Sequence, residues 1–168
     1  MNEEEKALWQ KINAYDPDEP DASFSFTSRL ARENYWSLDY ALQALHEYKK
    51  FMFLLCVSGK PLTPSDEVDQ VWHLHLIYSK LYWEDFCTRV LQRNIHHNPT
   101  QGGQAEGEKF TDWYAQTFIE YQKYFDKTPP SNIWPPAKIR FGEIIFTRVN
   151  KHRFWVLKKP KWFIKWKS

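Results

Sequence analysis

One aspartate and four histidines between positions 69 and 97 are candidate metal ligands. Asp69 and His73 are four residues apart, His75 follows two positions later, and His96 and His97 are neighbours. Imidazole nitrogens and carboxylate oxygens are ligands that both zinc and iron accept in proteins. The sequence therefore suggests a zinc or iron site that uses Asp69, His73 and one or both of His96 and His97.

Helical geometry separates these residues into two groups. Four residues turn an α-helix by about 400°, so Asp69 and His73 share a face, whereas His75 lies roughly 200° round from His73. We expect His75 to point elsewhere. A structural polar cluster explains the same spacing, with Asp69 accepting hydrogen bonds from a tryptophan indole, a tyrosine hydroxyl or His73, because buried polar groups need partners. Both interpretations stay open at this stage.

The distance along the chain is an objection to a shared metal site. A helix that continues to Gln92 carries the chain about 28 Å beyond His73. The loop with His96 and His97 would then have to return nearly the whole helix length. The objection disappears if the helix breaks earlier, for instance between Ser79 and Tyr82.

The start of this helix has its own local signals. Thr63 can act as the N-cap and Pro64 suits the first helical position, where its missing N–H costs nothing. Asp66 and Glu67 place negative charge at the positive end of the helix dipole. We therefore expect the helix to begin at Thr63.

Apolar side chains recur at intervals of three and four up to residue 125, which predicts further helices. The expected helices run from Glu3 to Ala14, from Ser23 or Ser25 to about Tyr35, from an N-cap at Ser37 to about Ser58, and from Phe110 to Phe125. A loop rich in Gly, Pro and Asn occupies 94–104. The pattern is typical of a mainly α protein.

The pattern of residue types changes after residue 127. Two Pro-Pro pairs bracket an extended segment, since residues before proline avoid the helical region. The runs 144–149 and 153–157 are β-branched and aromatic, with a turn at Asn150, and predict a small β-hairpin. We expect one domain over 1–168, a compact bundle of about five helices. It comprises an N-terminal helix and linker (1–22), a helical core (23–127) and a C-terminal part (128–168) with the hairpin or an extended segment.

Composition limits the class of protein. The net charge of +2 gives no clear nucleic-acid signature. The low glycine content, five Gly in 168 residues, argues against a β-sandwich or β-barrel, which needs many tight turns. The N-terminus, MNEEEK, lacks the order of a signal peptide, and no apolar run reaches the ~20 residues that span a bilayer. We expect a cytoplasmic protein with Cys56 and Cys87 as reduced core thiols. Cys87 could serve as a nucleophile beside a histidine, but its spacing matches no catalytic motif.

The last residues alternate basic and aromatic side chains. Trp162, Phe163 and Trp166 stand among lysines after Pro160. Such a tail suits a lipid interface or a protein partner. The alternative, which we favour, is that its aromatic side chains pack on the domain and its lysines face water.

The stretch around the candidate ligands resembles the glycine-rich domain-containing protein-like family (DUF1399). The matching residues are Pro64-Ser65, Val68-Asp69, Val71-Trp72-His73-Leu74-His75, Tyr82, Phe86-Cys87, His97-Asn98-Pro99, Gly102-Gly103, Ile133-Trp134-Pro135 and Arg148-Val149-Asn150. The resemblance covers about Phe26 to Val156 and marks Trp72, His75, Tyr82 and Cys87 as motif residues. It implies no settled activity. The plant members are larger and carry a glycine-rich tail, and some have an RNA-binding segment; this chain has no such tail.

Three functions remain open, and the sequence leaves it uncertain whether the protein is an enzyme. The first is a protein-interaction module, favoured by nine Trp and nine Tyr and by the lack of a nucleophile elbow or phosphate loop. The second is a metal-binding protein or metal-dependent enzyme that uses the Asp69 and His73 face with the loop histidines. The third is a peripheral membrane protein that binds through its C-terminal tail.

Overall fold

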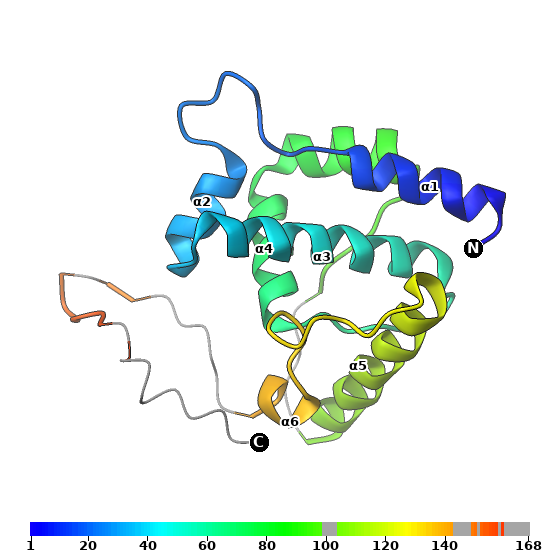
Figure 1. The fold of residues 1–168 in the computed structure, drawn as a ribbon. Coiled ribbons are helices and arrows are strands. Elements are labelled where there is room, and N and C mark those ends of the chain that lie inside the picture. The colour runs from blue at the N-terminus through cyan, green and yellow to red at the C-terminus, as the bar shows by residue number, and fades with distance from the viewer. Residues whose placement is uncertain (99–103, 143–148, 151, 158, 160–168) are drawn as a thin grey trace.

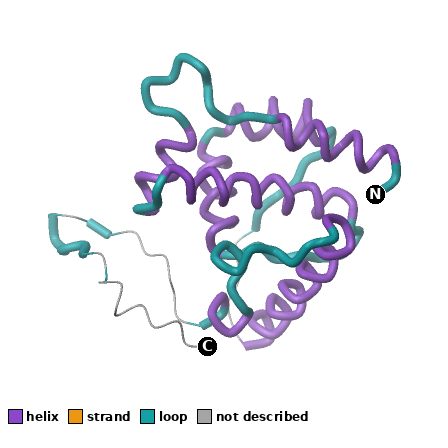
Figure 2. The backbone as a smooth tube through the Cα atoms, viewed as in Figure 1, coloured by secondary structure: helices purple, strands orange, loops and turns teal. Residues whose placement is uncertain are grey.

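In the computed structural model of the chain, residues 1–98, 104–142, 149–150, 152–157 and 159 are described. Over these ranges the protein is helical and no strand occurs. The helical segments are α1 (Glu3–Ala14), α2 (Phe26–Asn34), α3 (Leu38–Val57), α4 (Asp66–Ile77), the π-helix η1 (Leu81–Leu91), α5 (Gln104–Phe125) and α6 (Ala137–Arg140). Figure 2 shows these helices joined by loops. The mainly α class is confirmed, with more helical segments than the expected five.

Side-chain caps fix the starts of the first three helices. Asn2, Ser25 and Ser37 each accept a hydrogen bond from a backbone N–H in the first turn of α1, α2 and α3. This satisfies donors that a helix start leaves without partners. The predicted bounds of α1 and the N-cap Ser37 are confirmed, and of the two predicted starts of α2 it is Ser25 that caps the helix.

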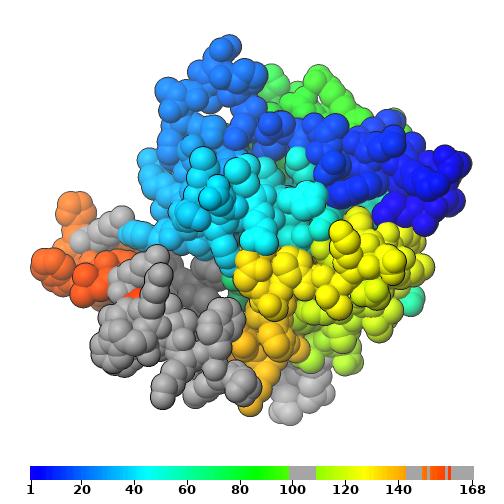
Figure 3. Space-filling model, viewed as in Figure 1, coloured from blue at the N-terminus to red at the C-terminus, as the bar shows by residue number. Residues whose placement is uncertain are grey.

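Helix α3 lies at the centre of the molecule. It contacts α1, α2, α4 and α5, and Figure 1 shows it crossing the middle of the helical body. Its four consecutive residues Phe51, Met52, Phe53 and Leu54 are all fully buried. This turn of the helix is apolar all round and must be covered on every side. On the face seen in Figure 3, α3 lies between α1 and the segment that follows α5.

A buried carboxylate ties α3 to the C-terminal part of the core. Glu47 on α3 is 2% exposed. Its oxygens accept from Lys50 Nζ at 2.8 Å, Tyr121 Oη at 3.2 Å and Trp134 Nε1 at 2.9 Å. These donors offset the cost of burying the charge. Trp134 belongs to the segment expected to be extended, and it packs into the core.

The C-terminal β-hairpin is not seen in the described residues. Residues 153–157 form no strand, and the backbone around Asn150 turns, with the N–H groups of Arg153 and Phe154 donating to its carbonyl. The expected first strand, 144–149, lies almost entirely outside the described residues. Strand preference expresses packing against other parts of the fold, so β-branched and aromatic residues alone do not fix a strand. A short helix, α6, precedes this region instead.

Other sequence predictions meet mixed outcomes. Both cysteines are free, Cys87 fully buried and Cys56 partly buried. Helix α5 starts at Gln104, six residues earlier than expected. The tail residues Trp162, Phe163 and Trp166 lie outside the described residues. Within the described part of the chain, no helix combines the length and apolar character needed to cross a membrane.

Candidate metal site

Helix α4 positions the first two candidate ligands. Its N-cap is Ser65, whose hydroxyl accepts from the Val68 N–H at 3.2 Å, so the prediction that the helix begins at Thr63 is wrong. Thr63 instead exchanges hydrogen bonds with the Thr117 hydroxyl of α5. Asp69, one turn into α4, and His73, one turn later, share a face of the helix, as their spacing predicts.

Helix α4 ends much earlier than position 92. Tyr78 adopts φ −79° and ψ 61°, outside the helical region, and η1 begins three residues later. Two residues of α2 hold this corner: Arg29 Nε donates to the Tyr78 hydroxyl at 2.8 Å, and the Phe26 ring packs edge-on against the Tyr78 ring. The expected continuous helix is therefore wrong, and the break lies at Tyr78, one residue before the span Ser79 to Tyr82 where a break would remove the distance objection.

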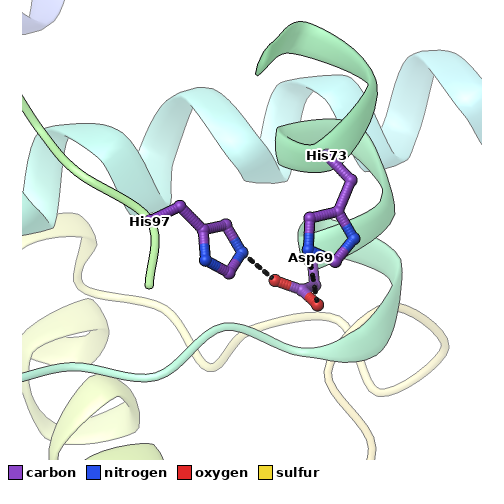
Figure 4. A group of neighbouring side chains, drawn as sticks. All are labelled: Asp69, His73 and His97. Carbon is purple, nitrogen blue, oxygen red and sulfur yellow. Dashed lines mark hydrogen bonds and ion pairs between the residues drawn. The ribbon is translucent and has the colours of Figure 1, made fainter. Parts of the chain in front are cut away.

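The π-helix η1 then leads the chain back. It ends at Gln92, which has a positive φ of 55° and whose backbone N–H donates a hydrogen bond to the Cys87 carbonyl. π-helical segments are rare, mostly occur as single turns, and are frequently found at functional sites. The loop after η1 returns along α4, and Figure 4 shows His97 reaching Asp69 from this loop.

Three candidate ligands converge at this place. His97 Nε2 lies 2.7 Å from Asp69 Oδ1, and His73 Nε2 lies 3.8 Å from Asp69 Oδ2. The two imidazole rings are stacked, with centroids 4.7 Å apart and planes 21° from parallel. Among the described residues, one ligand atom from each of the three side chains lies within 4.8 Å of the other two. Of the predicted ligands Asp69, His73 and one or both of His96 and His97, the structure brings together Asp69, His73 and His97.

The cluster is buried on one side and open on the other. The Asp69 and His97 side chains are 17% and 16% exposed, whereas His73 is 51% exposed. The His97 ring packs on the buried Trp72 ring at a centroid distance of 4.3 Å. An ion held here would therefore have a packed aromatic wall on one side and access to water on the other.

The donor set fits a transition metal. Zinc–ligand distances of ~2.0–2.2 Å place ligand atoms about 3–4 Å apart, so a contraction of about 1 Å would complete the geometry. Two imidazoles with one carboxylate suit zinc or iron(II), and sites with three protein ligands leave a position for water. Such an ion would act as a Lewis acid and lower the pKa of its bound water.

The neighbouring acids of α4 are engaged elsewhere. Asp66 pairs with Arg140 at 2.6 Å. Glu67 accepts from the Tyr40 hydroxyl at 3.5 Å, and burial, the largest effect, raises the pKa of Glu67 to about 7. A carboxyl with such a pKa spends part of its time neutral near pH 7, which suits it poorly for a metal. The described cluster thus has three protein ligands.

His96 and His75 lie outside the cluster. His96 is exposed and its ring packs near the Trp83 ring, so of the predicted histidine pair only His97 is brought to the site. His75 is buried between two tyrosines, with Nε2 3.0 Å from the Tyr15 hydroxyl and Nδ1 2.9 Å from the Tyr48 hydroxyl. Burial lowers the pKa of His75 to about 3. His75 thus joins the core and points away from His73, as predicted.

The remaining motif residues lie behind the cluster. Trp72, Tyr82 and Cys87 are buried, and Trp72 Nε1 donates to the Tyr82 hydroxyl at 3.0 Å. The Cys87 thiol sits beside the same hydroxyl, and burial is the main cause that raises the pKa of this thiol. A buried thiol with a raised pKa is a poor nucleophile.

A comparison with curated proteins finds one plant protein of similar sequence. Glycine-rich domain-containing protein 1 of Arabidopsis thaliana is 21% identical to this chain over 105 residues, which cover 60% of this chain and 13% of the plant protein. The chain thus matches about an eighth of the length of this relative. No protein-family model and no solved structure matches the chain.

Proposed function

We propose that this protein binds zinc or iron(II) through Asp69, His73 and His97. The convergence of these three side chains from α4 and a separate loop carries the proposal. A purely structural role would need only the His97–Asp69 hydrogen bond at 2.7 Å. It gives no reason for a second imidazole, half exposed, to stack on the first.

The similarity to the Arabidopsis protein supports a further statement. We propose that the chain is a distant relative of the glycine-rich domain-containing protein-like family, with the matching region as a compact helical unit. Asp69, His73 and His97 lie in the sequence motifs that resemble this family. The proposal concerns the helical unit alone.

The test compares two adjacent histidines. The parent protein should bind one equivalent of Co²⁺, used as a coloured substitute for Zn²⁺, and show visible absorption that zinc abolishes. His97→Gln should lose this signal, because it removes a ligand. His96→Gln should keep it, because His96 faces Trp83. Elemental analysis of the purified parent should find the resident metal.

Two results would overturn the proposal. One is a parent protein that shows no cobalt spectrum and contains no stoichiometric metal. The other is a cobalt spectrum that survives His97→Gln and is lost in His96→Gln, since the ion would then sit at another place.

An interaction module is the second candidate. Leu38 and Leu42 lie one turn apart on α3 and are 53% and 48% exposed, and Trp155 is 94% exposed. Exposed apolar side chains are common on monomers, but groups of them mark binding surfaces. This role is compatible with a metal site and stays second, because these side chains do not specify a partner.

A further inference from the structure

The loop that carries His97 is anchored at a second point. The backbone carbonyl of Ile95, two residues before His97, accepts a hydrogen bond from the Tyr82 hydroxyl of η1. The same hydroxyl accepts from Trp72 Nε1 of α4 at 3.0 Å. One oxygen atom therefore joins α4, η1 and the loop directly behind the metal cluster.

These groups are shielded from water. Tyr82 is fully buried and Trp72 is 5% exposed. The Tyr82 hydroxyl acts as donor and as acceptor at once, which uses its hydrogen-bonding capacity well. Without it, the buried indole N–H would lose its partner away from water, where unpaired polar groups are costly, and the partly buried Ile95 carbonyl would lose its donor.

The same contacts also place the His97 ring. This ring rests on the Trp72 indole at 4.3 Å, and the Tyr82 hydroxyl fixes that indole by its N–H. The loop backbone and the surface under the ligand are thus held by one side chain that contacts no ligand atom itself. In metal sites such supporting hydrogen bonds orient the ligands and tune affinity.

We propose that Tyr82 is a positioning residue of the metal site, which holds His97 within reach of Asp69 and His73 by joining the Ile95 carbonyl to the Trp72 indole. This inference rests on the proposed metal binding. It assigns to the hydroxyl a function separate from packing, since the ring alone would fill the core. Metal affinity should therefore respond to the loss of one oxygen atom.

The experiment uses two matched tyrosine variants. Tyr82→Phe removes the hydroxyl behind the site. Tyr114→Phe removes an equally buried hydroxyl that donates to the Pro135 carbonyl at 2.7 Å, in another part of the core. The free energy of unfolding of each metal-free variant is measured in urea, and the zinc dissociation constant by competition with a coloured chelator.

Both variants should lose stability, Tyr82→Phe more because two groups lose their partner, and only Tyr82→Phe should weaken zinc binding, by about 10–100-fold. A second variant, Trp72→Phe, removes the other partner of the Tyr82 hydroxyl and should also weaken zinc binding; it decides the matter if Tyr82→Phe does not fold. The positioning role is overturned if Tyr82→Phe binds zinc with the affinity of the parent. It is also overturned if both tyrosine variants lose zinc affinity equally. A parent protein that binds no zinc overturns the metal proposal itself, and this inference with it.

Discussion

Replacing His75 by glutamine should flatten the acid side of the protein's stability profile. The His75 side chain is 1% exposed and lies between the hydroxyls of Tyr15 and Tyr48. A neutral imidazole can donate from one nitrogen and accept at the other, so it satisfies both tyrosines. A protonated imidazole donates from both nitrogens and must be desolvated as an ion. Burial accordingly lowers the pKa of His75 to about 3.

The shift in pKa sets the direction and size of the effect. In the unfolded chain a histidine has a pKa of about 6.5. Below that pH the unfolded chain binds a proton that the folded protein does not, so the free energy of unfolding falls by about 1.4 kcal/mol per pH unit. The contribution of neutral His75 is complete above pH ~6.5 and is lost as the pH falls towards ~3, a total of about 4–5 kcal/mol.

The assay is urea unfolding of the metal-free protein between about pH 4 and pH 7.5, with a chelator present. Near pH 7 the parent should be more stable than His75→Gln by about 1–3 kcal/mol, since the variant loses at least one buried hydrogen bond. Glutamine does not titrate. The difference between the two proteins should therefore shrink by about 3 kcal/mol from pH ~6.5 to ~4.

A second variant separates burial from hydrogen bonding. Tyr48→Phe removes one partner of His75 and keeps the ring buried, so it should lower stability at every pH and retain the acid slope. Profiles of the parent and His75→Gln that run parallel between pH ~4 and ~6.5 would refute the reasoning. His75 would then be accessible to water in the folded protein.

Two further predictions concern the core. Glu47→Gln removes a buried charge that is paired with Lys50 at 2.8 Å, and should lower the free energy of unfolding in urea by about 2–3 kcal/mol. The control, Glu33→Gln at an exposed ion pair, should lower it by less than about 0.5 kcal/mol. Equal losses of stability in the two variants would contradict the role of Glu47. Burial raises the pKa of Cys56 to about 11 and also raises the pKa of Cys87. A thiol reagent at about pH 8 should therefore label both cysteines only after denaturant is added. Rapid labelling of the native protein would contradict this prediction.

Local chemistry accounts for the parts of the fold that sequence reasoning found. The bounds of α1 and the N-caps Ser25 and Ser37 follow from side chains that act on their own helix within three residues. Thr63 has the same local chemistry, yet its backbone N–H and carbonyl both bind Thr117, 54 positions away. A partner so distant in sequence leaves no local signal, and the true N-cap is two residues further on.

The candidate site also combines features that have a local sequence signal with features that depend on contacts between distant segments. Asp69 and His73 share a helix face because of helical periodicity, which a sequence displays directly. The choice between His96 and His97 depends on how the loop lies against Trp72 and Trp83, and their spacing cannot distinguish them. The role of Tyr82 could not be predicted from local sequence either, because its hydroxyl joins three segments that meet only in the folded protein.

The break at Tyr78 is the step on which the site depends. A helix that continued past this residue would carry the chain away from His73 by about 1.5 Å per residue, and His97 could not return to Asp69. Nothing in the sequence around Tyr78 forbids a helix, since no proline or glycine occurs there. The corner is instead held from α2, by Arg29 on the Tyr78 hydroxyl and Phe26 on its ring. The convergence of the three ligands thus depends on a helix that supplies none of them.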